Sequence, residues 1–314
     1  MTHPFFRRIE HRAEALLARA ALALLRRLGP VRASNLGGAV ARTIGPLLPV
    51  SRVADINLRY TMPELDEAAR RRVIRGVWDN LGRTVAELPH APSLRTTEAG
   101  PGWELEGADI QRACRETAGP IVIFSAHIGS WELMPRAMFE GGVPTAVFYR
   151  AASNPEVDAL IAGLREGVGG TGTPLFTKSG KGARAAMQYL ARGGRIGMLV
   201  DQKMNEGIEA RLFGRPAMTT SAAAAFALRF RCPLVPMHAV RIGPARYRMV
   251  LDPPLPLPDT GDQHADIATL TQAMNDTMER WIREWPEGWL WLHRRFPKEI
   301  YRRCGGGLGG KEVK

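Results

Sequence analysis

The chain of 314 residues is 45% hydrophobic, which is enough for a real core and excludes an intrinsically disordered protein. Its 43 basic and 31 acidic side chains give a formal charge of +12, so we expect an anionic partner: nucleic acid, anionic lipid, a phosphorylated substrate or an acidic carrier protein. The three scattered cysteines, Cys114, Cys232 and Cys304, have neither metal-ligand nor redox spacing, which favours a reducing, cytosolic environment.

Residues 1–50 are predicted to form a helical segment that associates with a membrane. One helical face is apolar and the opposite face carries arginines: Ala13, Leu17, Ala20, Leu24 and Leu28 against Arg8, Arg12, Arg19 and Arg26. This pattern is typical of a helix in an anionic membrane interface, although packing on the domain's own core fits it equally well. The run is too short for a convincing membrane span, and no signal-peptide cleavage site is evident.

The following residues predict an α/β domain over 51–300. Helical periodicity runs to about residue 90, where a set of apolar residues is expected to face a core: Val73, Val77, Leu81, Val85 and Leu88. Short apolar runs then alternate with helical stretches. We expect strands at 121–126, 144–149, 196–200, 234–237 and 247–251, and helices from about 129, from about 155, and at about 181–192, 219–230 and 264–285. This alternation predicts a single domain with a largely parallel central sheet flanked by helices, before a disordered tail at 301–314.

Polar residues follow three of the expected strands. His127, Arg150 and Asp201 each come directly after one of them. Ligands of open α/β sheets gather at the carboxyl ends of the strands, so these three residues are candidates for one site.

His127 and Glu132 have a chemical rationale as a pair. A neutral imidazole accepts a proton near neutral pH, and a carboxylate can fix its tautomer and stabilise the imidazolium that forms. We see no serine or cysteine in a nucleophile context, which favours general-base activation of a substrate hydroxyl. For the His-x4-Glu spacing alone, a structural alternative stays open, in which Glu132 favours the helix dipole and His127 packs on the surface.

Other chemistries find less support. The remaining histidines show no ligand spacing with His127, so no metal site is predicted. "FTKSGKG" at 176–182 fails as a phosphate loop, because Leu175 stands at the first glycine position. The basic residues are spread over many helices without a nucleic-acid-binding motif, and the aromatics and arginines of "WLWLHRRFPK" at 289–298 also fit a membrane belt or plain packing.

Several segments, in order, resemble the late acyltransferases of lipid A biosynthesis, the lauroyl/myristoyl transferases. "SAHIGSWEL" looks like the His-x4-(Asp/Glu) motif of glycerolipid-type acyltransferases, and further similar segments extend over about 52–298. They are "NLGRTVAEL" (80–88), "VFYRAASNPEVDALI" (147–161), "RIGMLVDQ" (195–202), "ARLFGRPAMTTSAAAAFALRFRCPLVP" (210–236) and "WLWLHRRFP". An ordered set is far more specific than His-x4-Glu alone.

The resemblance implies an inner-membrane enzyme whose active site faces the cytoplasm. It transfers a fatty acyl chain from acyl carrier protein, or less favourably coenzyme A, to a hydroxyl of an anionic lipid A precursor, without metal or cofactor. His127 is then the general base and Glu132 orients it, while Arg150, Asp201 and Gln202 line the substrate site. Relatives commonly begin with a clear hydrophobic anchor, which Arg19 interrupts here, and often carry asparagine where this chain has Ser130.

Two other functions stay open at this stage. A same-fold acyltransferase could act on another membrane glycolipid, a phosphatidyl-sugar or an aminolipid. A non-enzymatic protein could keep the fold as a peripheral membrane- or nucleic-acid-binding scaffold. Neither the acyl chain length nor the acylated hydroxyl follows from the sequence.

Overall fold

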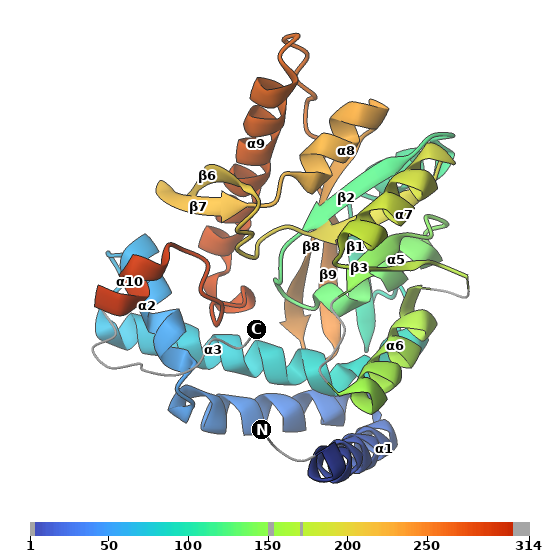
Figure 1. Cartoon of the computed structure of the whole chain (residues 1–314). Coiled ribbons are helices and arrows are strands. Elements are labelled where there is room, and N and C mark those ends of the chain that lie inside the picture. The colour runs from blue at the N-terminus through green and yellow to red at the C-terminus, as the bar shows by residue number, and fades with distance from the viewer. Residues whose placement is uncertain (1–3, 150–153, 170–171, 304–314) are drawn as a thin grey trace.

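The N-terminal part of the protein is helical. The computed structural model describes residues 4–149, 154–169 and 172–303. The first elements are α1 (Pro4–Ile44), η1 (Gly45–Leu47), α2 (Ser51–Thr61), α3 (Glu67–Glu87) and η2 (Leu88–Ser93). α1 consists of two helical segments that meet at Gly29, whose φ of 72° and ψ of 163° are not helical. Gly37 of α1 and Gly82 of α3 touch so closely that a Cβ on either would collide with the other helix, so the two helices pack along one end of the molecule (Figure 1).

The rest of the chain alternates strands with helices. The strands are β1 (Gly102–Glu106), β2 (Ile121–Ser125), β3 (Ala146–Tyr149), β4 (Leu175–Thr177), β5 (Arg195–Leu199), β6 (Ile208–Leu212), β7 (Arg215–Thr219), β8 (Leu234–Gly243) and β9 (Arg246–Leu251). The helices are α4 (Ala108–Glu116), η3 (Trp131–Leu133), α5 (Met134–Glu140), α6 (Pro155–Gly169), α7 (Gly180–Ala191), α8 (Ala222–Phe230), α9 (Gln263–Glu284), η4 (Pro286–Gly288) and α10 (Lys298–Arg303).

Seven strands form the central sheet, in the order β1-β9-β8-β2-β5-β3-β4, and β6 pairs with β7 in a separate hairpin. Every pair in the large sheet is parallel except β8 with β9. β2 and β5 are parallel neighbours in which Ser125 lies opposite Leu199. The residues that follow these two strands are therefore brought together at one edge of the sheet.

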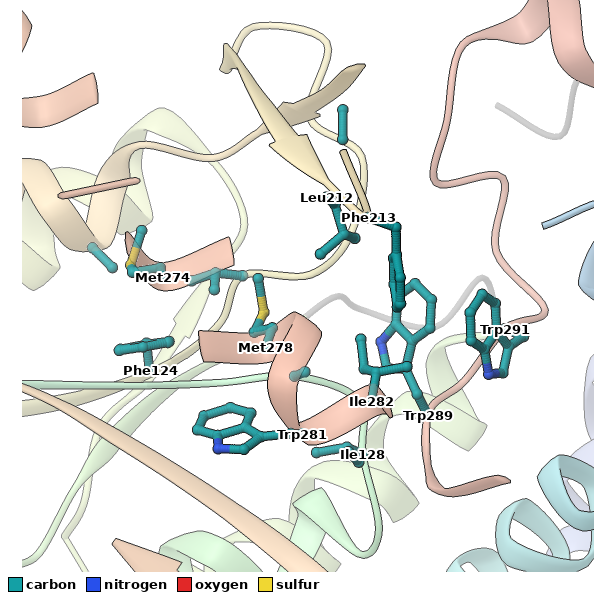
Figure 2. Close-up of a cluster of buried hydrophobic side chains, with 14 of the residues drawn as sticks. Phe124, Ile128, Leu212, Phe213, Met274, Met278, Trp281, Ile282, Trp289 and Trp291 are labelled. Atoms are coloured by element: carbon teal, nitrogen blue, oxygen red, sulfur yellow. The ribbon is translucent and has the colours of Figure 1, made fainter. Parts of the chain in front are cut away.

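Two hydrophobic cores lie on the two faces of the sheet. α4, α5 and α6 cover one face, where alternate residues of β2 such as Ile121 and Ile123 are buried. α7, α8 and α9 cover the other, where Val122 and Phe124 are buried. Burial on both faces explains why β2 reads as an unbroken apolar run. Figure 2 shows part of the second core, in which the rings of Phe124 and Trp281 stack.

The predicted α/β fold with a largely parallel sheet is confirmed, and all five predicted strands exist. The sequence reasoning missed β1, β4, α4 and the β6–β7 hairpin. The tail predicted for 301–314 begins too early, because residues 301–303 belong to α10, where the buried Tyr301 hydroxyl donates to Asn57. Residues 304–314 lie outside the described part of the chain. The domain boundaries themselves stay a prediction.

The apolar face predicted for residues 73–88 is only half correct. Val73 and Val77 are buried, but Val85 is 58% exposed. At that end of α3 three polar side chains are buried beside Ala86: Asn80, Thr84 and Glu87. Within the described residues, we find no helix with the length and hydropathy that a bilayer crossing requires.

Candidate active site

His127, which is partly exposed, and the buried Asp201 form a pair at the carboxyl ends of β2 and β5. His127 Nδ1 lies 2.8 Å from Asp201 Oδ1, and the backbone N–H of His127 donates to Oδ2 at 3.0 Å. The indole N–H of Trp289 donates to the same Oδ2 at 2.8 Å. The backbone N–H of Val200 donates to the Ser125 carbonyl, so β2 and β5 stay hydrogen-bonded up to their carboxyl ends. His127 and Asp201, which follow these ends, are therefore close enough to pair.

The Asp201 carboxylate is held in its ionised form. Burial alone would raise the pKa of this carboxyl group, but the charge of His127 and hydrogen bonds from His127 and Trp289 outweigh burial and hold the pKa well below its usual range. An anionic partner at Nδ1 assigns the ring proton to Nδ1. Nε2 of His127 is therefore the nitrogen that can take up a proton.

Glu132 does not hold His127 in this structure. Its carboxylate makes a two-point pair with the Arg165 guanidinium of α6, with distances of 3.0 Å from Nε and 2.6 Å from Nη2. The Glu132 hydrogen bond is also the main reason that the pKa of Arg165 lies above its usual value. The carboxylate that bonds His127 in this structure is thus Asp201, and not Glu132 as the His-x4-Glu spacing predicts. The reason is geometric: Trp131, Glu132 and Leu133 form a 3₁₀ turn, and α6 lies beside that turn.

Gln202 and His293 lie beside the free nitrogen of His127. The Gln202 amide nitrogen is 3.4 Å from His127 Nε2 and 3.2 Å from His293 Nε2, and its oxygen accepts from Lys178 at 3.4 Å. Burial, then the neighbouring His127, lowers the pKa of His293. Burial therefore favours the neutral form of the His293 ring. Arg150, the remaining predicted site residue, lies outside the described part of the chain.

A largely apolar cavity of about 370 Å³ opens at His127. β2, β3 and β5 line one side of it, and α5 and α6 supply much of the other. Its apolar lining includes Ile123, Met134, Met138, Val147, Val168, Met198, Leu199 and Met237. Methionines are flexible and polarizable, so such walls accommodate a long hydrocarbon without a fixed polar pattern. The site thus combines a histidine–aspartate pair with a largely apolar cavity.

Some of the site residues could be predicted from the sequence and others could not. His127, Asp201 and Gln202 follow strands and meet at one edge of the sheet, as their positions indicate. Trp289 and His293 were present only as part of "WLWLHRRFPK", which offered no sign that its residues reach the base. Arg165 stands inside a helix without any motif, and nothing in the sequence marked it. Among the described residues, no group of three or more His, Cys, Asp or Glu side chains is placed to hold a metal ion.

Comparison with known proteins identifies the family. The family profile of the bacterial lipid A biosynthesis acyltransferases matches residues 4–298, nearly the whole chain. The chain belongs to this family. No curated protein matches the chain. Among solved structures it is similar to the 1-acyl-sn-glycerophosphate acyltransferase PlsC from Thermotoga maritima, with 11% identity, a TM-score of 0.34, and coverage of 76% of this chain and 98% of that one.

Proposed function

We propose that this acyltransferase moves a fatty acyl chain from acyl carrier protein to a hydroxyl of a lipid A precursor. The observation that carries the proposal is the His127–Asp201 pair at the opening of the apolar cavity, in a chain of this family. The cavity fits the hydrocarbon of the donor, so its thioester carbon lies near His127 Nε2. The acceptor hydroxyl then approaches from the open side.

The reaction needs one base and no covalent enzyme intermediate. His127 Nε2 removes the proton of the acceptor hydroxyl as the oxygen attacks the thioester carbon, and Asp201 stabilises the imidazolium that forms. The tetrahedral intermediate collapses with cleavage of the carbon–sulfur bond, and the proton passes to the departing thiolate. The Gln202 amide, beside Nε2, is a suitable donor to the developing oxyanion. Glu132 acts through Arg165 at the cavity wall.

The charge of the chain does not choose between a carrier protein and coenzyme A, because both donors are anionic. A net charge of +12 attracts an acidic carrier protein and an anionic glycolipid alike. We propose an acyl carrier protein as donor, a phosphorylated glycolipid as acceptor and no resident cofactor. Coenzyme A as donor is the alternative.

The N-terminal helix supports a membrane location. Leu17 and Leu24 of α1 are 72% and 54% exposed, and Arg12 and Arg19 are exposed on the same helix. Leu47 of η1, which follows α1, is 82% exposed. The apolar face that could have packed on the core instead faces outward. We place the protein at the cytoplasmic face of the inner membrane, with α1 lying in the interface.

The test is mass spectrometry of lipid A from a strain that lacks this protein. We expect the mutant lipid A to lose the mass of one acyl chain and complementation to restore it, which also gives the chain length and position. An unchanged lipid A, with a mass loss in another glycolipid, would favour a same-fold acyltransferase with a different acceptor. Vesicle binding without thioester consumption would favour a membrane-binding scaffold.

A further inference from the structure

The buried polar face of α3 has no part in the reaction described above. Asn80, Thr84 and Glu87 are 5%, 3% and 1% exposed, and they belong to the segment "NLGRTVAEL". Their spacing of four and three residues places them on one side of the helix. Buried polar groups need partners, so these partners show what this face of α3 does.

Asn80 contacts the two loops that lead to the active site. Its amide nitrogen donates to the carbonyl of Gly129 at 3.0 Å and to that of Gly288 at 3.3 Å. Gly129 comes two residues after His127, and Gly288 directly precedes Trp289. Thr84 adds a second donor to the Gly129 carbonyl, at 3.2 Å.

The same two loops are also bonded to each other. The backbone N–H of Gly129 donates to the Gly288 carbonyl at 2.9 Å, and that of Leu290 donates to the His127 carbonyl at 2.9 Å. Gly129 has a φ of 60°, and a Cβ there would collide with the carbonyl of Ala239. Because no side chain fits at this position, the loop is held through its backbone groups.

The far side of Asn80 is fixed by a buried arginine. Arg241 of β8 donates from Nε to Asn80 Oδ1 at 2.9 Å, from Nη2 to Thr84 at 3.1 Å and from Nη1 to Glu87 at 2.6 Å. Glu87 also accepts from the Tyr247 hydroxyl and from the backbone N–H of Ala245. An oxygen that accepts from Arg241 leaves the Asn80 NH₂ facing the two glycine carbonyls, which fixes the orientation of the amide. A satisfied buried network of this kind is rigid.

We propose that Asn80 is a positioning residue for the active site. It holds the loop after β2 and the loop before Trp289 at a fixed spacing, so that His127 and Trp289 both reach the Asp201 carboxylate. Arg241, through Asn80 and Thr84, connects this spacing to the sheet at β8. The kinetic consequence rests on the proposed acyl transfer, whereas the structural consequence does not.

The decisive variant is Asn80→Asp, which keeps an acceptor for Arg241 and removes the donor to both glycine carbonyls. A misplacement of about 1 Å can cost on the order of 100-fold in rate, so we expect kcat to fall about 100-fold. KM for the acyl donor should stay within about twofold, because Asn80 lies outside the residues that line the cavity. Hydrogen exchange should speed up at the amides of Gly129 and Leu290, and not in β9.

Matched variants separate positioning from general stability. Thr84→Val removes the hydroxyl at nearly constant shape and Thr84→Ser keeps it, so kcat should fall about tenfold in the first and stay within about twofold in the second. Val77→Ala lies on the same helix, in the core and outside the network. It should lower the melting temperature and leave kcat, corrected for the folded fraction, within about twofold.

The outcomes that overturn the proposal are specific. Folded Asn80→Asp protein with unchanged exchange at Gly129 and Leu290, or with a kcat like that of Val77→Ala, contradicts it, and so does a rise in KM alone. If Asn80→Asp fails to fold, equal kcat values in Thr84→Val and Thr84→Ser contradict it. A different result separates the two proposals. If the wild-type protein shows no acyl transfer, but hydrogen exchange at Gly129 and Leu290 is faster in Asn80→Asp, the positioning role is supported and only the proposed function is contradicted.

Discussion

At the scale of single residues, the site depends on which carboxylate bonds His127 and which one bonds Arg165. Asp201 makes hydrogen bonds with both the ring and the backbone of His127, and it accepts a third from the Trp289 indole N–H. Glu132, the partner that the His-x4-Glu spacing predicts, bonds Arg165 at the cavity wall. Glu132 and Arg165 should therefore behave as one unit in catalysis.

This assignment predicts non-additive kinetics for Glu132 and Arg165. Glu132→Ala and Arg165→Ala should each lower kcat/KM strongly, and the double variant should lose little more than the worse single one. Residues in one ion pair couple by about 0.5–3 kcal/mol, so we expect an interaction energy of at least about 1 kcal/mol. Steady-state kinetics of the four proteins in the cycle measure it.

The control for this cycle is Arg184→Ala, which removes an exposed arginine of α7. Combined with Glu132→Ala, it should give additive losses. Additive losses from Glu132→Ala and Arg165→Ala themselves would contradict the pairing and favour a direct action of Glu132 on His127.

At the scale of elements, the cavity is shaped by how β2, β3 and β5 face α5 and α6. Gly197 lies in the middle of β5, opposite Ile123 of β2 and Val147 of β3, and it lines the cavity. A Cβ there would lie 3.2 Å from Thr145 Cγ2 and 3.4 Å from Val147 Cγ1. A side chain at this position therefore takes space from the cavity.

We expect Gly197→Val to favour shorter acyl donors. Each methylene excluded from an apolar site costs about 0.8 kcal/mol, so preference between donors that differ by two methylenes should shift by about 15-fold in kcat/KM. Gly163→Ala, on α6 with open space around it, is the control and should leave the preference unchanged. Competition between two acyl donors, read by mass spectrometry, measures the shift. An unchanged preference in Gly197→Val would place the acyl chain elsewhere.

The packing of α9 on the sheet makes stability depend on pH. His238 of β8 is buried, stacks on Trp281 of α9 at 4.5 Å, and its Nδ1 has no hydrogen-bond partner within the described residues. Burial lowers the pKa of His238 to about 4, with Asp252 raising it and Arg280 lowering it further. Between about pH 6.5 and pH 4 the unfolded chain binds a proton that the folded chain does not, so stability falls as the pH falls through this window.

The contribution of His238 to this fall is about 3 kcal/mol. We expect His238→Leu to remove that part of the slope of unfolding free energy between about pH 6.5 and pH 4, and to leave the slope above about pH 7 unchanged. Chemical denaturation across this pH range measures it. Parallel curves for the two proteins throughout would mean that His238 titrates alike in both states.

Which features could be predicted from the sequence depends on how far apart in the chain the interacting residues lie. Apolar runs and helical periods are local, so the sheet and its flanking helices were predictable, and the strand-end rule brought His127 and Asp201 together. The partner of Glu132 depends on how α6 packs, and the buried polar face of α3 depends on Arg241, 161 residues away from Asn80. Such choices are made by tertiary contacts, which no local pattern records.

At the scale of the whole molecule, the exposed leucines of α1 and η1 should govern membrane binding. Leu17→Glu/Leu24→Glu should weaken partitioning to anionic vesicles at least tenfold, since each buried leucine is worth about 1.5–3 kcal/mol. Gln263→Glu/Ala265→Glu adds the same charge at exposed positions of α9 and should have a small effect. Vesicle co-sedimentation measures both, and equal losses in the two variants would show that only net charge matters.

The central claim is that the His127–Asp201 pair transfers an acyl chain from a carrier-protein thioester to a lipid A precursor. For the direct measurement, the purified protein in vesicles is incubated with the precursor and with acyl carrier protein that bears a labelled acyl chain. The product is followed by mass spectrometry. We expect the wild-type protein to add one acyl chain, and His127→Ala and Asp201→Asn, both folded, to be at least about 100-fold slower. Undiminished transfer by folded His127→Ala would contradict the account.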